Sequence, residues 1–60
     1  MMNYTIWNRD DNEDEILVEV FNGNDVHEIQ KQFVNRGYVV EEYFDTCNSS
    51  FIRFLKVKEN

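Results

Sequence analysis

The stretch EILVEVFNGNDVHEIQKQFVNRGY, from Glu15 to Tyr38, changes its hydrophobic period partway along. In its first part, Ile16, Val18 and Val20 share one face, as expected for a strand that buries one side. After a short turn, apolar residues recur every three or four positions, which is the spacing of an amphipathic helix. We therefore expect a strand that leads directly into a helix.

The predicted helix carries signals for both of its ends. The turn Asn22–Asn24 precedes it, and Asp25 with Glu28 matches a capping box, in which an acidic cap is followed by Glu three positions later. Gly37 is placed to end the helix in a left-handed conformation. The apolar stripe expected to face a sheet consists of Val26, Ile29 and Phe33, with Val34 flanking it.

Strands are predicted on both sides of this helix, over residues 2–8, 15–21, 38–45 and 51–58. If the third strand runs parallel to 15–21, it is antiparallel to 2–8 and can lie beside it, which predicts the strand order 2-1-3-4. The predicted fold class is α+β, with topology β-β-α-β-β and one helix on one face of a four-stranded antiparallel sheet. Alternation in 51–58 is imperfect, which indicates either a bulge near Phe54–Leu55 or a strand covered on both faces.

The composition indicates one small domain over residues 1–60, with 42% hydrophobic and 15% aromatic residues and no proline. A chain of this length buries only about 60% of its unfolded surface, so its stability is small. Cys47 is the single cysteine, which excludes an intramolecular disulfide. The start MMNYTIWN does not match a signal peptide, and the longest aliphatic run, Ile16–Val18, is far shorter than a membrane span. We expect a cytoplasmic protein with no membrane contact.

Negative charge is concentrated in the first half of the chain. The net charge is −6; residues 1–30 hold eight acidic residues and one basic residue, whereas residues 31–60 hold four acidic and five basic residues. Such asymmetry favours a partner with a basic surface, although it also simply keeps a protein in solution. The sign of the charge disfavours binding to nucleic acid through phosphates. Five carboxylates lie in the predicted loop between the first two strands, on Asp10, Asp11, Glu13, Asp14 and Glu15.

Three interpretations of this acidic loop are open: a hydrated loop, a weak cation site and a protein-binding patch. Asp10, Asn12 and Asp14 have the first three spacings of a calcium loop. However, Glu15 stands where the sharp-turn Gly belongs, and Phe21 stands where the closing Glu belongs. This excludes an EF-hand, and we predict no metal site and no cofactor. Blocks of like charge normally stay hydrated, and an acidic patch also attracts a basic partner.

No combination of residues predicts catalysis. His27 is the single histidine and lies near the polar side of the predicted helix. Cys47 has no second cysteine and no nearby histidine in sequence, whereas a nucleophile needs a base and a zinc site needs about four ligands. Glu41 and Glu42 are adjacent in a strand and point to opposite sides, and we expect them to face basic residues across the hairpin. We therefore predict a protein that is not an enzyme.

One helix cannot cover both faces of a four-stranded sheet, so some aromatic side chains should be exposed. Exposed apolar patches usually mark an interface, and Tyr and Trp are enriched at interface hot spots. We predict that Trp7 and Tyr43 contact a partner, together with the acidic loop. The alternative is that edge aromatics wrap a small core. Several of the following residues are expected on or near the face away from the helix: Tyr4, Trp7, Leu17, Phe21, Tyr43, Phe51 and Leu55.

Together these observations predict a non-catalytic protein-binding module. In its size, acidity and single cysteine, the chain resembles the small accessory proteins with which large bacteriophages bind host proteins and inhibit or modulate them. That resemblance implies a host protein with a basic surface as the partner, in the host cytoplasm. Two alternatives are a homodimer that buries its uncovered sheet face against a copy, and a small nucleic-acid-binding regulator that uses the basic final strand, SFIRFLKVK.

Overall fold

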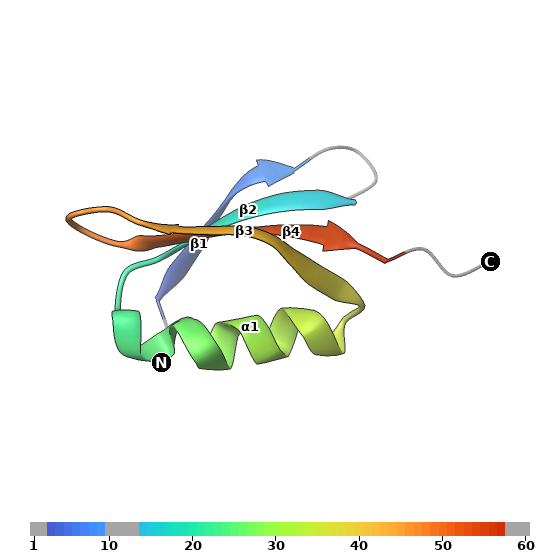
Figure 1. Ribbon diagram of the computed structural model, residues 1–60, viewed down its shortest axis with the longest axis horizontal. Coiled ribbons are helices and arrows are strands. Elements are labelled where there is room, and N and C mark those ends of the chain that lie inside the picture. Colours follow the sequence, from blue (N-terminus) through green and yellow to red (C-terminus); the bar gives the residue numbers. More distant parts are fainter. Residues whose placement is uncertain (1–2, 10–13, 58–60) are drawn as a thin grey trace.

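The computed structural model describes residues 3–9 and 14–57, which form a sheet with a helix on one side (Figure 1). The elements in chain order are β1 (Tyr4–Arg9), β2 (Glu15–Val20), the 3-10 helix η1 (Gly23–Asp25), α1 (Val26–Asn35), β3 (Tyr38–Asp45) and β4 (Ser50–Lys56). These match the predicted segments to within two residues at the strand ends. Among the described residues, no helix combines the length and apolar character that crossing a membrane requires.

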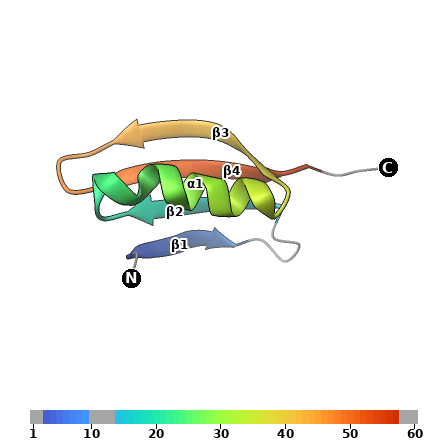
Figure 2. The ribbon, with the colours of Figure 1, turned by 90° about the horizontal axis from the view of Figure 1, so that it is seen from below.

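The four strands are antiparallel to their neighbours in the order β1-β2-β4-β3. The α+β class is therefore confirmed, but the predicted order 2-1-3-4 is wrong. Figure 2 shows the helix lying over β4 and β2 and running along them, with β1 and β3 on either side. Because β4 lies between β2 and β3, the helical connection carries the chain over β4 to the far edge of the sheet.

The burial pattern of each strand matches its position in the sheet. In β2 and β4, every second residue on the helix side is buried, and the residues between them are only partly exposed. Strands covered in this way belong in the centre of a sheet. Of the two alternatives for the last strand, the bulge near Phe54–Leu55 is wrong, since β4 pairs without interruption from Ser50 to Lys56. The irregularities lie instead at Trp7 in β1 and Glu41 in β3, the two edge strands, where bulges are common.

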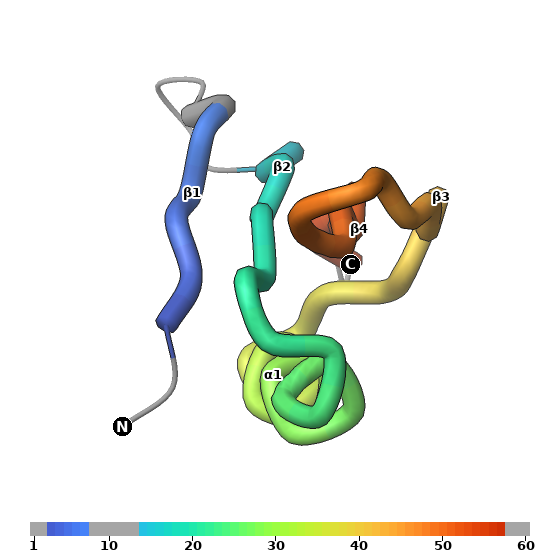
Figure 3. The backbone as a smooth tube through the Cα atoms, turned by 90° about the vertical axis from the view of Figure 1, so that its left-hand side faces the viewer, coloured from blue at the N-terminus to red at the C-terminus, as the bar shows by residue number. Residues whose placement is uncertain are grey.

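The core lies between α1 and the sheet. Figure 3 shows α1 on one side of the strands. The helix contributes Ile29 and Phe33, both buried, and Phe33 stacks on Phe54 of β4 with ring centroids 4.8 Å apart. Tyr4 and Tyr38 meet the Phe33 ring edge-on from the two edge strands. Burial of each large side chain contributes about 1.5–3 kcal/mol to folding. The helical stripe predicted from sequence thus forms the centre of the core.

The two ends of the helical segment differ in how well they were predicted. Gly37 has a φ of 97°, as expected for a glycine that ends a helix. The capping box is wrong, because Asp25 lies in the helical region and makes no side-chain cap hydrogen bond. Asn22 takes that role for η1, and its side-chain oxygen accepts a hydrogen bond from the Asn24 backbone amide at 3.0 Å. A short 3-10 turn therefore precedes α1.

Candidate functional site: the open face of the sheet

The face of the sheet away from α1 carries a mixed charged and apolar surface. Cross-strand partners place their side chains on the same face, so the pairing register assigns each residue. We call the resulting surface the open face; it consists of Thr5, Trp7, Glu15, Leu17, Glu19, Val39, Glu42, Phe44, Phe51, Arg53 and Leu55.

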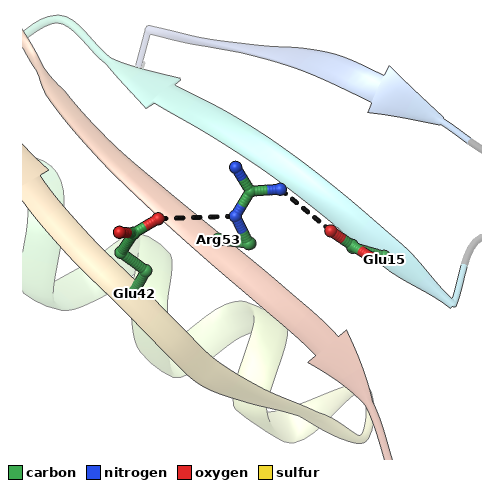
Figure 4. Close-up of polar contacts among 3 residues, drawn as sticks. All are labelled: Glu15, Glu42 and Arg53. Atoms are coloured by element: carbon green, nitrogen blue, oxygen red, sulfur yellow. Dashed lines mark hydrogen bonds and ion pairs between the residues drawn. The ribbon is translucent and has the colours of Figure 1, made fainter.

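A row of charges crosses the middle of the open face. Arg53 of β4 donates from Nη1 to Glu15 Oε1 of β2 at 2.8 Å, and its Nε lies 3.5 Å from Glu42 Oε1 of β3 (Figure 4). The hydrogen bond to Glu15 is the largest cause that raises the pKa of Arg53; the contact with Glu42 raises it further, while partial desolvation opposes both. The row is partly exposed, so it contributes little to stability. Its main effect is to fix three charges in alternating order.

Two cross-strand pairs of apolar residues on β3 and β4 also belong to the open face. Phe44 and Phe51 stack with ring centroids 5.1 Å apart and planes 10° from parallel. Phe44 is 41% exposed, and Val39, which lies across from Leu55, is 46% exposed. The ion pair of Glu42 and Arg53 lies between these two apolar pairs. Exposed apolar surface on a small protein commonly marks an interface.

Trp7 stands at the opposite side of the open face, on the bulge in β1. It is 61% exposed, yet its indole Nε1 donates to Glu19 Oε1 at 2.8 Å. Ser49 in the β3–β4 turn donates to the other oxygen of Glu19 at 2.6 Å. The indole N–H is therefore satisfied while most of the ring faces solvent. A tryptophan held in this way can enter an interface at a low conformational cost.

The structure separates the residues that the sequence predicted as a partner-binding set. Trp7 and Tyr43 lie on opposite edge strands and opposite faces, since Tyr43 pairs with the buried Ile52 on the helix side. Glu15 belongs to β2 and contacts Arg53, while the Asp14 backbone carbonyl accepts from the Lys56 amide at 2.7 Å. The other three predicted residues, Asp10, Asp11 and Glu13, lie outside the described residues.

Tyr43 instead belongs to a polar corner at the β3–β4 turn. A hollow of about 460 Å³ is lined there by residues of both strands and by η1. Within it, Ser50 Oγ donates to Asp45 Oδ1 at 2.7 Å, and the Tyr43 hydroxyl lies 3.5 Å from Ser50 Oγ. The hydrogen bond from Ser50, followed by that from Tyr43, lowers the pKa of Asp45 below its ordinary value of 3.8. These hydroxyl groups stabilise the carboxylate form and brace the turn.

The described residues that could bind a metal ion or act in catalysis do not form a cluster. Within residues 3–9 and 14–57, no three His, Cys, Asp or Glu side chains are arranged to hold a metal ion. Cys47 is exposed in the β3–β4 turn, and His27 is exposed on α1. The expected contact between Glu42 and a basic residue across the hairpin is confirmed by its ion pair with Arg53.

No family model, curated protein or solved structure matches this chain. The candidate site is therefore interpreted from its own geometry. That geometry includes Glu19, Phe44 and Arg53, which the sequence did not single out as site residues. Alternation within SFIRFLK groups Phe51, Arg53 and Leu55 on one side, and this was the available signal for the central part of the face.

Proposed function

We propose that the protein is a non-catalytic binding module that contacts another protein through the open face. The observation that carries this proposal is Trp7, which is 61% exposed and held by Glu19. Leaving a tryptophan ring in water forgoes the burial energy that a partner surface could supply. The stacked pair of Phe44 and Phe51 adds a second anchor on the same face.

The charge of the chain supports a partner with a basic surface. At a net charge of −6, the protein attracts a positive surface over about 10 Å at moderate salt. The predicted contributors are Asp10, Asp11, Glu13, Asp14 and Glu15, of which Glu15 is already compensated by Arg53. A host protein bound by a bacteriophage-type accessory protein fits this description.

The two other candidate functions use parts of the same surface. A homodimer through the open face is favoured by the exposed Phe44–Phe51 pair, since a second copy would cover it. Nucleic-acid binding through β4 has less support, because Arg53 already contacts Glu15 and Glu42 and would bring both carboxylates close to a phosphate.

Capture of a partner from bacterial lysate, identified by mass spectrometry, tests the proposal. Trp7→Gln and Phe44→Gln should each weaken binding of the captured partner at least about tenfold, in the range of interface hot spots. Phe21→Gln is the matched control, because Phe21 is 49% exposed but lines the hollow on the helix side and belongs to neither the open face nor β3. Circular dichroism should show that all three variants remain folded. Equal binding by wild type, Trp7→Gln and Phe44→Gln would exclude the open face as the contact surface.

The acidic loop is tested through association kinetics with the same partner. Conversion of Asp10, Asp11, Glu13, Asp14 and Glu15 to their amides should slow association at low salt and change dissociation much less. The difference from wild type should shrink as salt rises. The control is Asp25→Asn with Glu28→Gln, which removes charge from the helical segment instead. Identical association rates for wild type and the five-amide variant at low salt would identify the loop as a hydrated turn.

A further inference from the structure

The edge strand β3 has an unusual combination of length and exposed apolar residues. It spans Tyr38–Asp45 and pairs with β4 on one side only, among the described strands. Val39, Val40, Tyr43 and Phe44 are 41–46% exposed, and they are spread over both faces of the strand. An edge strand of this kind presents backbone groups and side chains that another extended chain can pair with.

A groove runs beside this edge on the helix side. Its volume is about 250 Å³, and it lies between β3 and one flank of α1. Val40 forms one wall and Val34 the other, and both are about half exposed. A strand added to β3 would direct every second side chain into this groove. The groove therefore fits an apolar side chain, with Lys31 and His27 lining the helix flank.

The charge row of the open face stops at the same edge. It runs from Glu15 through Arg53 to Glu42, so its signs alternate across β2, β4 and β3. The Glu42 side chain is 56% exposed. Opposite charges on neighbouring strands stabilise a sheet, and like charges destabilise it. The position that continues this row, on a strand beside β3, therefore favours Lys or Arg.

We propose that the β3 edge binds an extended segment of the partner protein as a fifth strand, with a Lys or Arg opposite Glu42. The cation would lie on the open face, and an apolar residue two positions away in the bound strand would lie on the same face and pack on Phe44. A residue that points to the helix side would fill the groove beside Val40. This binding mode rests on the proposed function and adds the chemistry of the bound segment.

A second copy of this chain is a poor occupant of the edge. Antiparallel pairing of two β3 strands about their centres would bring Glu41 and Glu42 of one copy against the same residues of the other. The bulge at Glu41 and these carboxylates are features that protect edge strands from self-association. The carboxylates disfavour an identical acidic strand and favour a basic one.

Two synthetic peptides test the proposal directly on the full chain. Both alternate valine and threonine and have blocked ends; one carries a central arginine and the other a central glutamate. Amide chemical shifts would report binding, and hydrogen exchange would locate it. The arginine peptide should bind about tenfold more tightly than the glutamate peptide, since the central pair changes from attractive to repulsive. It should also slow exchange of β3 amides and leave β1 amides unchanged.

Glu42→Gln should reduce this tenfold preference to about twofold or less. Glu41→Gln removes the same net charge one residue away and should retain the preference, which separates a local pair from overall attraction. Val34→Asp should weaken both peptides if a side chain occupies the groove. Equal binding of the two peptides, no binding of either, or protection of β1 would overturn the proposal. Sedimentation of the free protein as a dimer with protected β3 amides would identify a second copy as the occupant. The peptide measurements do not use the captured partner or the Trp7 and Phe44 variants. A negative result here would therefore overturn strand addition at β3 without deciding whether the open face binds a partner.

Discussion

The two faces of the sheet are built from the same strands but differ in how far their side chains are buried. On the helix side, Val18, Val20, Ile52 and Phe54 are all fully buried. On the open face, the residues between them are partly exposed and include Arg53 in contact with two carboxylates. One face is therefore devoted to folding, while the composition of the other is free to serve binding.

This division has a physical origin in the length of the chain. In a chain of sixty residues, the described part forms one α-helix of ten residues, which covers a single face of a four-stranded sheet. A chain of this size lacks a second layer, so the outward positions of the central strands must tolerate water. Glu15, Glu19 and Arg53 meet that condition, whereas Trp7 and Phe44 are more exposed than folding alone requires.

The largest expected difference between the two faces is in the stability lost on truncation of two phenylalanines of β4, one on each face. Phe54→Ala should cost about 3–5 kcal/mol, because it opens a cavity beneath Phe33. Phe51→Ala should cost about 1 kcal/mol, since its side chain is partly exposed. A domain of this size has only a few kcal/mol of stability, so we expect the first variant to be largely unfolded. Urea denaturation followed by circular dichroism measures both, and equal losses would show that the open face is a second core.

The sequence was sufficient to predict the elements of this fold but not the order of its strands. Alternation in β2, the helical period of α1 and Gly37 are local signals, and each predicted its element correctly. Strand order depends instead on which edges pair, and both candidate orders satisfy the same alternation. Apolar residues on both sides of β4 were the signal for a central strand, and from the sequence alone this pattern could not be separated from a bulge.

The candidate site was predicted in part. The bulge at Glu41 explains why Tyr43 was expected on the open face and Phe44 was not. Tyr38 and Val40 face the helix side, so simple alternation would place Tyr43 on the open face. The extra residue at Glu41 reverses the alternation, so Tyr43 returns to the helix side and Phe44 takes the open face. The exposure of Trp7 needed no such detail and was predicted correctly.

A smaller effect is expected when the charge row is interrupted. Arg53→Met removes the cation between Glu15 and Glu42 but retains an unbranched side chain of similar length. The free energy of unfolding should change little, and much less than for Phe54→Ala, since exposed ion pairs contribute little. Urea denaturation at low and high salt measures the change, with Glu28→Gln on α1 as a control. A loss as large as that of Phe54→Ala would show that the row is as important for folding as the core.

The smallest effect concerns the polar corner on the helix side, where Asp45 accepts a hydrogen bond from Ser50. Because the pKa of Asp45 is lowered in the folded state, its carboxylate contributes stability that is fully present above the ordinary value of 3.8 and is lost as pH falls through the lowered pKa. Wild type should therefore lose more stability than Asp45→Asn between about pH 5 and pH 2. The difference between the two proteins is the quantity to measure, by urea denaturation across this range, since other carboxylates titrate there too.

Ser50→Ala is the matched variant for this test. It removes the main donor to Asp45 while leaving the carboxylate in place, so the pKa of Asp45 should rise toward 3.8. An NMR titration of the Asp45 carboxyl in wild type and Ser50→Ala measures that rise. If both proteins titrate at the ordinary value, the Ser50 hydroxyl does not hold the carboxylate in solution, and the β3–β4 turn is braced by Thr46 instead. The Thr46 hydroxyl accepts hydrogen bonds from the Asn48 and Ser49 amides at 3.3 and 3.1 Å, so the turn would keep its shape at low pH in either protein.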